Sequence, residues 1–364
     1  MIRILHVVGA RPNFMKIAPI IRELNRRKLC CQQILVHTGQ HYDENMSGVF
    51  FSDLGLPWPD VNLEVGSGSH ASQTAQVMIR FEPVVRQFNP DVVIVPGDVN
   101  STLACALVCS KLGIKIAHVE AGLRSFDRTM PEEINRVVVD HISDILFVPS
   151  IDAIENLRKE GIDEHKIKFV GNVMIDSLEY MLPTAAMRWT ALQSHLGVEE
   201  FILVTLHRPS NVDDINPLRE ILNSLIEVTH KIPVVFPVHP RTRKHIDVYA
   251  KDLEVSRLKL IEPLGYTDFL AVESHAKLVI TDSGGVQEET TFLHIPCITI
   301  RDNTERPVTI TNGTNRLVRP KYQQLLTAIQ ESMQHTDRLA TLPELWDGNT
   351  SSRLIDHLIS NVSI

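Results

Sequence analysis

Short runs of β-branched residues alternate with amphipathic helical stretches along almost the whole chain. The runs are nearly all apolar rather than alternating polar and apolar, so each strand must be covered on both faces. Helices that follow the strands in regular succession provide this cover and connect neighbouring strands in parallel. The pattern therefore predicts an α/β protein built from parallel, doubly wound sheets.

This alternation occurs twice along the chain. The predicted strands are Arg3–Val8, Gln33–His37, Val92–Val95, Lys115–Val119, Ile145–Val148 and Ile167–Val170 in the first half, and Phe201–Thr205, Val234–Val238, Leu258–Ile261, Leu278–Thr281 and Cys297–Ile300 in the second. At 364 residues the chain is longer than a single core usually supports. We therefore expect two doubly wound, Rossmann-like domains that join near Gly171, before a helical region of about Val173–Leu196. The helix after the first strand is expected at about Lys16–Lys28.

Charge and hydropathy exclude several classes of protein. A net charge of −8 and a pI near 6.1 argue against a general nucleic-acid or membrane-surface binder. No apolar run of about 18 residues occurs, and the first residues enter a strand directly, so neither a membrane span nor a signal peptide is predicted. The cysteines are spaced poorly for disulfides or zinc, so we expect free thiols in a reducing cytoplasm.

A small glycine-bearing turn follows the strand Leu278–Thr281 and reads Asp282-Ser283-Gly284-Gly285-Val286-Gln287-Glu288-Glu289. A helix that begins there would present unpaired N–H groups and a partial positive charge to a phosphate. Glu288 or Glu289 would then be placed to accept hydrogen bonds from a ribose. No dinucleotide or P-loop fingerprint occurs in the chain. The alternative is an ordinary strand–helix turn whose acids only favour the helix dipole.

Ionisable residues also follow most of the other strands. Ligands of open α/β sheets bind beyond the carboxyl ends of the strands, so these positions are candidate site residues. In the first half they are Arg11, Lys16, Asp98, Glu120 and Glu132, and in the second half His207, Arg208, His239, Arg301 and Arg306. A cleft between two such domains would hold a nucleotide on one wall and perform proton chemistry on the other.

Each candidate acid also has a structural interpretation. Thr129 and Glu132 have the spacing of a capping box, so Glu132 would only close a helix start. Asp98 would form an Asx turn ahead of the next helix. Glu120 ends a strand and would be partly buried, with His118 and Arg124 as structural partners.

The other candidates have equally plain interpretations. His207 would be a satisfied core histidine, and Arg11 and Lys16 would be solvated charges. The occurrence of so many ionisable groups at strand ends is what favours a functional site.

Several motifs together resemble one family. They are Gly9-x-Arg11-Pro12-x3-Lys16-x-Ala18-Pro19, Gly97-Asp98-x2-Ser101-Thr102, His118-Val119-Glu120-Ala121-Gly122-Leu123-Arg124, Pro131-Glu132-Glu133-x-Asn135-Arg136, His207-Arg208, the Thr281–Glu289 turn and Arg301-Asp302-x-Thr304-Glu305-Arg306-Pro307. In this order they are similar to the motifs of the non-hydrolysing UDP-N-acetylglucosamine 2-epimerases.

This resemblance implies a fold and an assembly. It implies a glycosyltransferase-B-like arrangement with the active site in the interdomain cleft, residues 1–170 forming the first domain and residues 171–349 the UDP-binding domain. The last helix, residues 350–364, would pack back on the first domain. The resemblance further implies a homodimer, and neither a metal ion nor a nicotinamide cofactor.

The resemblance also implies a reaction, the interconversion of UDP-GlcNAc and UDP-ManNAc. UDP would be eliminated across C1–C2 to give 2-acetamidoglucal and would then add back, with the proton returned to the opposite face. Asp98, Glu120 and Glu132 would transfer protons, with His207 as a further catalytic residue. The residues that would hold UDP are Arg11, Lys16, His207, Ser283, Gly284, Gly285, Glu289 and Arg306, and Phe269 matches a position that lines the uracil pocket.

The chain departs from the family pattern in three places. The first loop reads Arg11-Pro12-Asn13-Phe14-Met15 instead of the commoner Arg-Pro-Glu-x-Ile. Val99 stands where members often carry threonine, and the loop Gln40–Met46 lacks the arginine found in members that UDP-GlcNAc activates allosterically. Related 2-epimerases of UDP-diacetamido uronic acids stay open as an alternative activity. A glycosyltransferase would not need all three acids, and a non-catalytic UDP-sugar sensor would be expected to have lost one of them.

Overall fold

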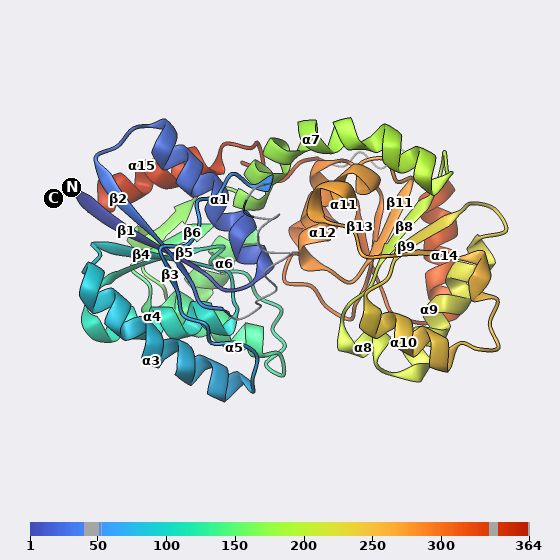
Figure 1. The fold of residues 1–364 in the computed structure, drawn as a ribbon, viewed down its shortest axis with the longest axis horizontal. Coiled ribbons are helices and arrows are strands. Elements are labelled where there is room, and N and C mark those ends of the chain that lie inside the picture. Colours follow the sequence, from blue (N-terminus) through green and yellow to red (C-terminus); the bar gives the residue numbers. More distant parts are fainter. Residues whose placement is uncertain (40–50, 52, 335–340, 363–364) are drawn as a thin grey trace. The chain divides into compact units, whose positions relative to one another are not determined.

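The structure is a computed structural model that describes residues 1–39, 51, 53–334 and 341–362. Its residues divide into two compact units. Unit 1 comprises Met1–Glu179 and Glu344–Ile364, and unit 2 comprises Tyr180–Pro343. Both are α/β units, each built on one sheet (Figure 1).

Unit 1 contains a seven-stranded parallel sheet in the order β3-β2-β1-β4-β5-β6-β7. The strands are β1 (Ile2–Val8), β2 (Cys31–His37), β3 (Val61–Asn62), β4 (Val92–Pro96), β5 (Lys115–Val119), β6 (Ile145–Val148) and β7 (Ile167–Phe169). The strand order reverses beside β1, which has β2 on one side and β4 on the other. Such a reversal marks the part of a parallel sheet where ligands bind.

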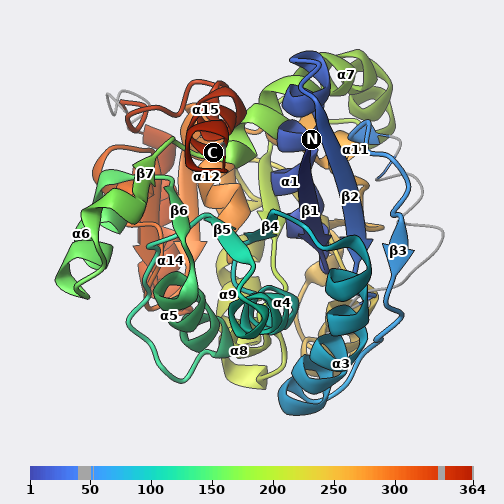
Figure 2. The same ribbon diagram turned by 90° about the vertical axis from the view of Figure 1, so that its left-hand side faces the viewer.

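Helices cover both faces of this sheet (Figure 2). One face carries α3 (His70–Phe88), α4 (Asn100–Leu112) and α5 (Pro131–Ile142), and the other carries α1 (Arg11–Arg26) and α15 (Thr350–Val362). Helix α6 (Ile151–Lys159) contacts β6 and β7. One core cluster of the unit includes Phe81 from α3 with Val93 and Val95 from β4, all of them buried.

Helix α1 begins five residues earlier than the sequence analysis expected, at Arg11 instead of Lys16. Pro12 lies in its first turn, where the missing N–H would have had no partner inside the helix. Arg11 and Lys16 therefore belong to the first turns of a helix, and not to a loop that precedes it.

Unit 2 contains a six-stranded parallel sheet in the order β10-β9-β8-β11-β12-β13. The strands are β8 (Ile202–Thr205), β9 (Val234–Pro237), β10 (Lys259–Ile261), β11 (Leu278–Thr281), β12 (Cys297–Ile300) and β13 (Asn315–Val318). The edge strand β13 was not predicted from the sequence. Here the order reverses beside β8, which has β9 on one side and β11 on the other.

The helices of unit 2 also cover both faces of its sheet. They are α8 (Pro209–Val212), α9 (Ile215–Val228), α10 (Pro240–Tyr249), α11 (Tyr266–Glu273), α12 (Gly284–Phe292), α13 (Val308–Thr311) and α14 (Tyr322–Gln334). Helices α9, α10 and α14 lie on one side of the sheet, and α11 and α12 lie on the other (Figure 1). The two apolar clusters of the unit lie on these opposite faces.

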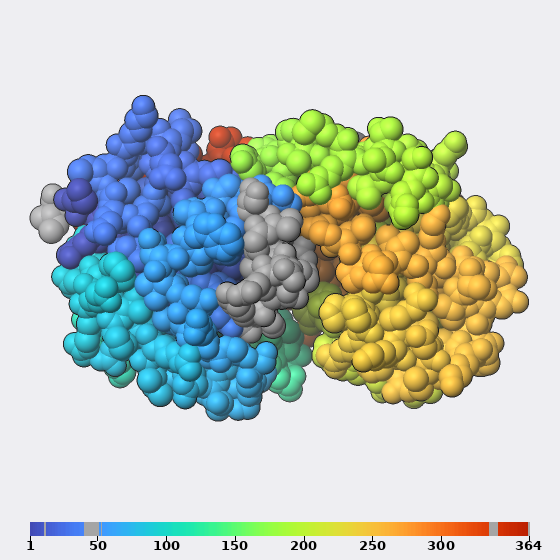
Figure 3. Space-filling view, viewed as in Figure 1, coloured from blue at the N-terminus to red at the C-terminus, as the bar shows by residue number. Residues whose placement is uncertain are grey.

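Helix α7 (Val173–Leu196) carries residues of both units, because the division between Glu179 and Tyr180 falls inside it. One side of this helix is exposed along its length in Figure 3, and Met187 on it is 77% exposed. Although α7 has 24 residues, no helix in the described part of the chain is apolar enough over sufficient length to cross a membrane.

Candidate active site

Two of the candidate acids of unit 1 lie at the ends of adjacent strands. Asp98 follows β4 and Glu120 follows β5, and these strands pair in parallel so that Pro96 lies opposite Val119. The carboxyl ends of both strands therefore meet at the same edge of the sheet. This is the edge at which α/β sheets bind their ligands.

Glu120 forms a buried ion pair with Lys16 of α1. Both side chains are less than 10% exposed, so each supplies the charge that the other needs away from water. Gly97 lies beneath this pair with a φ of +66°, and a Cβ there would come within 2.9 Å of Lys16 Nζ. The positive φ favours glycine at this point, and the absence of a Cβ leaves room for the Lys16 ammonium. The interpretation of Lys16 as a solvated charge is wrong.

The backbone of Glu120 adopts a strained conformation. Its φ is +75°, in the left-handed region that non-glycine residues rarely enter. Such a conformation costs on the order of 1–3 kcal/mol and persists only where the surroundings impose it. Here the N–H groups of Glu120 and Ala121 both donate to the carbonyl of Phe147, at 3.1 and 3.0 Å.

A fully buried network lies next to the Glu120 turn. Asp140 of α5 accepts hydrogen bonds from His118 Nδ1 at 2.7 Å and from the N–H of Gly122 at 3.0 Å. It also pairs with Arg124 at 2.7 Å. Burial alone would raise the pKa of Asp140, but the charges and hydrogen bonds of His118 and Arg124 hold it below its usual value.

This network assigns His118 and Arg124 to Asp140 instead of Glu120. It also fixes Gly97, because His118 Nε2 lies 2.8 Å from the Gly97 carbonyl oxygen. Asp140 was missed in the sequence analysis. It lies in the last half of a helix, far from any strand end, so the position that revealed the other acids gave no signal for it.

Asp98 is held by α5. Its carboxylate, 28% exposed, forms an ion pair with Arg136 at 2.5 Å. The Asn135 amide donates to the Asp98 carbonyl at 2.8 Å. Helix α4 begins with Val99 as its N-cap, and no side-chain cap is formed there.

The capping-box interpretation of Glu132 is wrong. Helix α5 has Met130 as its N-cap and no side-chain cap, and Thr129 Oγ1 donates instead to Asp127 at 2.6 Å. The acid that closes this loop is Glu133, which accepts from the N–H groups of Ser125 and Phe126, both at 2.9 Å.

Glu132 is left as a partly exposed carboxylate. It lies four residues before Arg136, and residues with this spacing share one face of a helix. Because Arg136 contacts Asp98, Glu132 lies on the face of α5 that is turned toward Asp98.

In unit 2 the glycine-bearing turn begins a helix as predicted, with Ser283 as the N-cap of α12. A Cβ on Gly284 would lie 2.6 Å from Nη1 of Arg306. The Arg306 guanidinium therefore lies against the helix N-terminus, where both favour an anion. Its Nε donates to Glu288 at 2.7 Å, and Glu305 also pairs with it.

His207 lies at the end of β8, next to this turn. Its Nδ1 is 2.8 Å from the buried carboxylate of Asp282, while the imidazole is 58% exposed. Burial would raise the pKa of Asp282, but hydrogen bonds from His207, Asn211 and the Arg208 N–H hold it below its usual value. An ionised Asp282 fixes Nδ1 as a donor and orients the ring, so the core-histidine interpretation is wrong.

Glu289 lies deeper in α12. It is 4% exposed and accepts a hydrogen bond from the Tyr266 hydroxyl at 2.9 Å. The fully buried Glu273 of α11 lies against it, and burial, together with the charge of Glu289, raises the pKa of Glu273 well above its usual value. Phe269, half-buried on the same helix, packs against the apolar cluster of that face.

Two sequence-level candidates lie outside the described side chains. Arg11 is the first residue of α1, but its side chain is not described, and the loop Gln40–Met46 lies outside the described residues. In the rest of the chain no group of three or more His, Cys, Asp or Glu side chains is placed to hold a metal ion.

Comparison with known proteins identifies the family. The sequence model of the UDP-N-acetylglucosamine 2-epimerases matches residues 22–359. The chain belongs to this family. The resemblance inferred from the motifs is thereby confirmed.

Individual relatives are similar along nearly their whole length. The UDP-N-acetylglucosamine 2-epimerase of Methanocaldococcus jannaschii is 46% identical over 89% of this chain and 90% of its own. The UDP-2,3-diacetamido-2,3-dideoxy-D-glucuronate 2-epimerase of Pseudomonas aeruginosa is 42% identical over 98% of this chain and 99% of its own.

Solved structures give the same result. The M. jannaschii UDP-GlcNAc 2-epimerase, crystallised with UDP-GlcNAc and UDP, has a TM-score of 0.89 and 42% identity, covering 99% of this chain and all of its own. A glycosyltransferase of Rickettsia africae, at 14% identity and a TM-score of 0.58, shares the fold alone. The expected fold class, two doubly wound domains of the glycosyltransferase-B-like type, is confirmed.

Proposed function

We propose that this epimerase-family chain interconverts UDP-GlcNAc and UDP-ManNAc by eliminating UDP to 2-acetamidoglucal and adding it back. One observation supports this most strongly. Unit 1 carries two acids at one sheet edge, Asp98 and Glu120, with Glu132 on the facing helix α5, and unit 2 carries a helix N-terminus suited to an anion, with Arg306 against it and His207 on the preceding Asp282.

Leaving-group stabilisation is the task of unit 2. The C2 proton is not next to a carbonyl group, so elimination depends on the charge that develops on the departing diphosphate. The N–H groups of Gly284 and Gly285 at the start of α12, the Ser283 hydroxyl and the Arg306 guanidinium would stabilise such charge. His207, oriented by Asp282, adds a further donor at this end.

Recognition of the nucleoside is also proposed for unit 2. Glu289, held by Tyr266, would accept hydrogen bonds from the ribose hydroxyls. Phe269, on the same helix as Tyr266, would line the uracil pocket. Arg11 and Lys16, from the first turns of α1, would complete the contacts to the diphosphate.

Proton transfer is the task of unit 1. Inversion at C2 requires that a proton leaves one face and returns to the other, so two acid–base groups in different surroundings are needed. Glu120 is buried and paired with Lys16, whereas Asp98 and Glu132 are partly exposed and lie near Arg136. These are the different surroundings that the reaction needs.

The proposal includes a setting and an assembly. We place the protein in the cytoplasm as a homodimer, with neither a metal ion nor a nicotinamide cofactor. Free thiols at all five cysteines are consistent with a reducing compartment.

The decisive experiment follows the anomeric proton by NMR. Purified protein is incubated separately with UDP-GlcNAc and with UDP-ManNAc, without added metal or NAD and with a chelator. Both reactions should reach the same mixture of the two sugars. Turnover of UDP-diacetamido uronic acids alone would move the assignment to that substrate, and loss of activity with the chelator would contradict the metal-free mechanism.

A further inference from the structure

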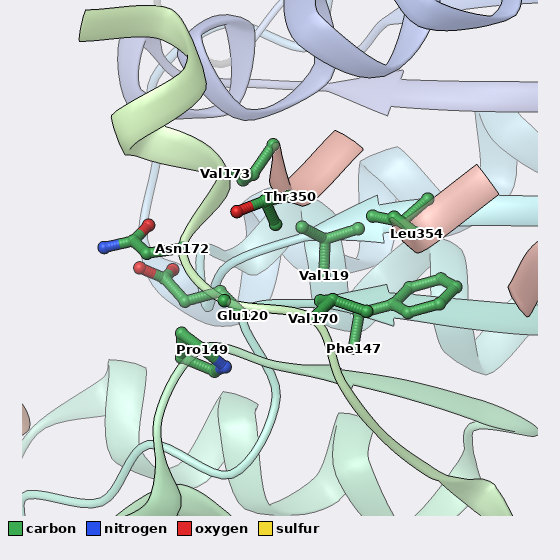
Figure 4. A pocket seen from close by; sticks show the side chains of 10 residues that line it. Val119, Glu120, Phe147, Pro149, Val170, Asn172, Val173, Thr350 and Leu354 are labelled. Atoms are coloured by element: carbon green, nitrogen blue, oxygen red, sulfur yellow. The ribbon is translucent and has the colours of Figure 1, made fainter. Parts of the chain in front are cut away.

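A small enclosed cavity lies in unit 1 beside Glu120 (Figure 4). Its volume is about 10 Å³, close to the smallest space that holds one water molecule. Strands β5 and β6 and the starts of α7 and α15 surround it. The lining residues are Val119, Glu120, Phe147, Pro149, Val170, Gly171, Asn172, Val173, Thr350 and Leu354.

Asn172 brings an unsatisfied donor to this cavity. The residue is 2% exposed, and its Oδ1 accepts the N–H of Met174 at 3.0 Å, which caps the start of α7. Its Nδ2 has no hydrogen-bond partner among the residues that the structure describes. Leaving a buried amide donor unsatisfied costs about 1–3 kcal/mol, so such groups usually meet an ordered water.

The amide of Asn172 and the carboxylate of Glu120 lie next to each other at one end of the cavity, and Leu354 and Phe147 lie at the other (Figure 4). A cavity of this size leaves room for one bridging molecule. A water there can accept a hydrogen bond from Nδ2 and donate one to the carboxylate.

We propose that Asn172 is a positioning residue for Glu120 and acts through one internal water molecule in this cavity. The role rests on the proposed function, in which Glu120 transfers a proton. Lys16 binds Oε2 of Glu120 from α1, and the water adds a second donor from the start of α7. Two donors from different elements thus hold the carboxylate in place. The backbone of Glu120, at a φ of +75°, sets the position from which its side chain starts.

The other charged group near the cavity is already engaged. Asp176, one turn further along α7, accepts the N–H groups of Thr350 and Ser351 at 3.1 and 2.7 Å. Both of its oxygens therefore cap α15, and burial raises the pKa of this carboxyl above its usual value. Two lining side chains carry a donor without a partner among the described residues, Asn172 Nδ2 and Thr350 Oγ1. Of the two, Asn172 lies beside the Glu120 carboxylate (Figure 4).

Two substitutions separate the positioning role from the capping role. Asn172→Asp keeps an oxygen for the Met174 N–H but replaces the Nδ2 donor with an acceptor. Asn172→Ser keeps both roles, because a hydroxyl can accept from Met174 and donate into the cavity. Asn62→Asp is the matched control, since Asn62 likewise accepts the N–H of the second following residue, Glu64, at 3.0 Å.

We expect Asn172→Asp to lower kcat about ten- to hundredfold, the scale of a misplaced catalytic group, and to change KM less than threefold. Its added negative charge should also move the acid limb of the pH–rate profile to higher pH. Asn172→Ser and Asn62→Asp should stay within about threefold of wild type in kcat. Full kcat in Asn172→Asp, or equal losses in Asn172→Asp and Asn172→Ser, would overturn the proposal.

A high-resolution crystal structure of the wild-type protein provides a test that does not depend on activity. It should show one ordered water within hydrogen-bond distance of both Asn172 Nδ2 and the Glu120 carboxylate. A dry cavity, or an amide turned away from it, would overturn the inference even if the enzyme is active. Wild-type protein that shows the water but does not epimerise UDP-GlcNAc would overturn the proposed function instead.

Discussion

The fully buried Glu273 makes the stability of unit 2 depend on pH in a direction that can be worked out. Its two carboxyl oxygens have no donor partner among the described residues, and the Glu289 carboxyl lies against it. Burial and the charge of Glu289 raise the pKa of Glu273, so the folded protein keeps a proton that the unfolded chain releases. The stability that depends on this proton is therefore fully present below the ordinary pKa of glutamate, and it is lost as the pH rises toward the folded pKa of Glu273.

The substitution Glu273→Gln removes this dependence. The glutamine amide is neutral at every pH and can donate to Glu289 as the protonated acid does. Each pH unit between the unfolded and folded pKa of Glu273 costs the wild type about 1.4 kcal/mol. The free energy of unfolding of Glu273→Gln should exceed that of the wild type by about 1.4 kcal/mol more for each pH unit above about pH 5. For a domain with the length of unit 2, this corresponds to about 3–5 °C in melting temperature per pH unit.

Urea unfolding of both proteins at pH 5, 6, 7 and 8 measures this difference. The control is Glu199→Gln, which makes the same substitution at an exposed glutamate. A constant difference between Glu273→Gln and wild type, or one that shrinks as the pH rises, would refute a protonated Glu273.

Three further predictions concern the reaction. Asp98→Asn, Glu120→Gln and Glu132→Gln should each lower turnover about a hundredfold or more, with UDP binding retained in at least one by calorimetry; full turnover in any of them would remove that acid from the mechanism. In D2O, deuterium should appear at C2 of both sugars and a little UDP should be released, whereas full retention of the C2 hydrogen would point to oxidation and reduction at a neighbouring carbon. His207→Ala and Arg306→Ala should weaken UDP binding and raise the amount of free UDP released per epimerisation. Unchanged release of UDP would contradict the proposal that these two residues bind the nucleotide.

The sheets were predictable because buried parallel strands are continuous apolar runs, and those runs are visible without a structure. The errors occur where local signals conflict with tertiary contacts. Helix α1 was expected to begin at Lys16, yet it begins at Arg11, because a proline in the first turn, here Pro12, loses no helix hydrogen bond. Strand β13 begins with the fully buried Asn315, whose amide donates hydrogen bonds to Gln287 and Thr309. A strand that begins with a buried polar residue has no continuous apolar run by which it could be predicted.

The candidate acids were predictable from position alone, since residues after parallel strands gather at one edge of the sheet. Their partners were not. Lys16 and Glu120 are 104 positions apart, and their pairing depends on how α1 lies on the sheet. The choice between Glu132 and Glu133 as the loop-closing acid depends on a shift of one residue in where α5 begins, and helix ends are the least predictable feature of a sequence.

The surroundings of the three acids lead to one more expectation about the reaction. The Glu120 side chain is 5% exposed and bound by Lys16, whereas Asp98 is 28% exposed and Glu132 is partly exposed. A proton on a buried, paired carboxyl exchanges with water more slowly than one on an exposed carboxyl. If Glu120 serves one face of C2 and Asp98 or Glu132 the other, the two directions of the reaction should return different fractions of the original hydrogen. Initial-rate mass spectrometry in D2O, started separately from each sugar, measures these fractions. Equal deuterium contents in both first-formed products would show that the three acids exchange alike, and would remove the division of faces argued from their burial.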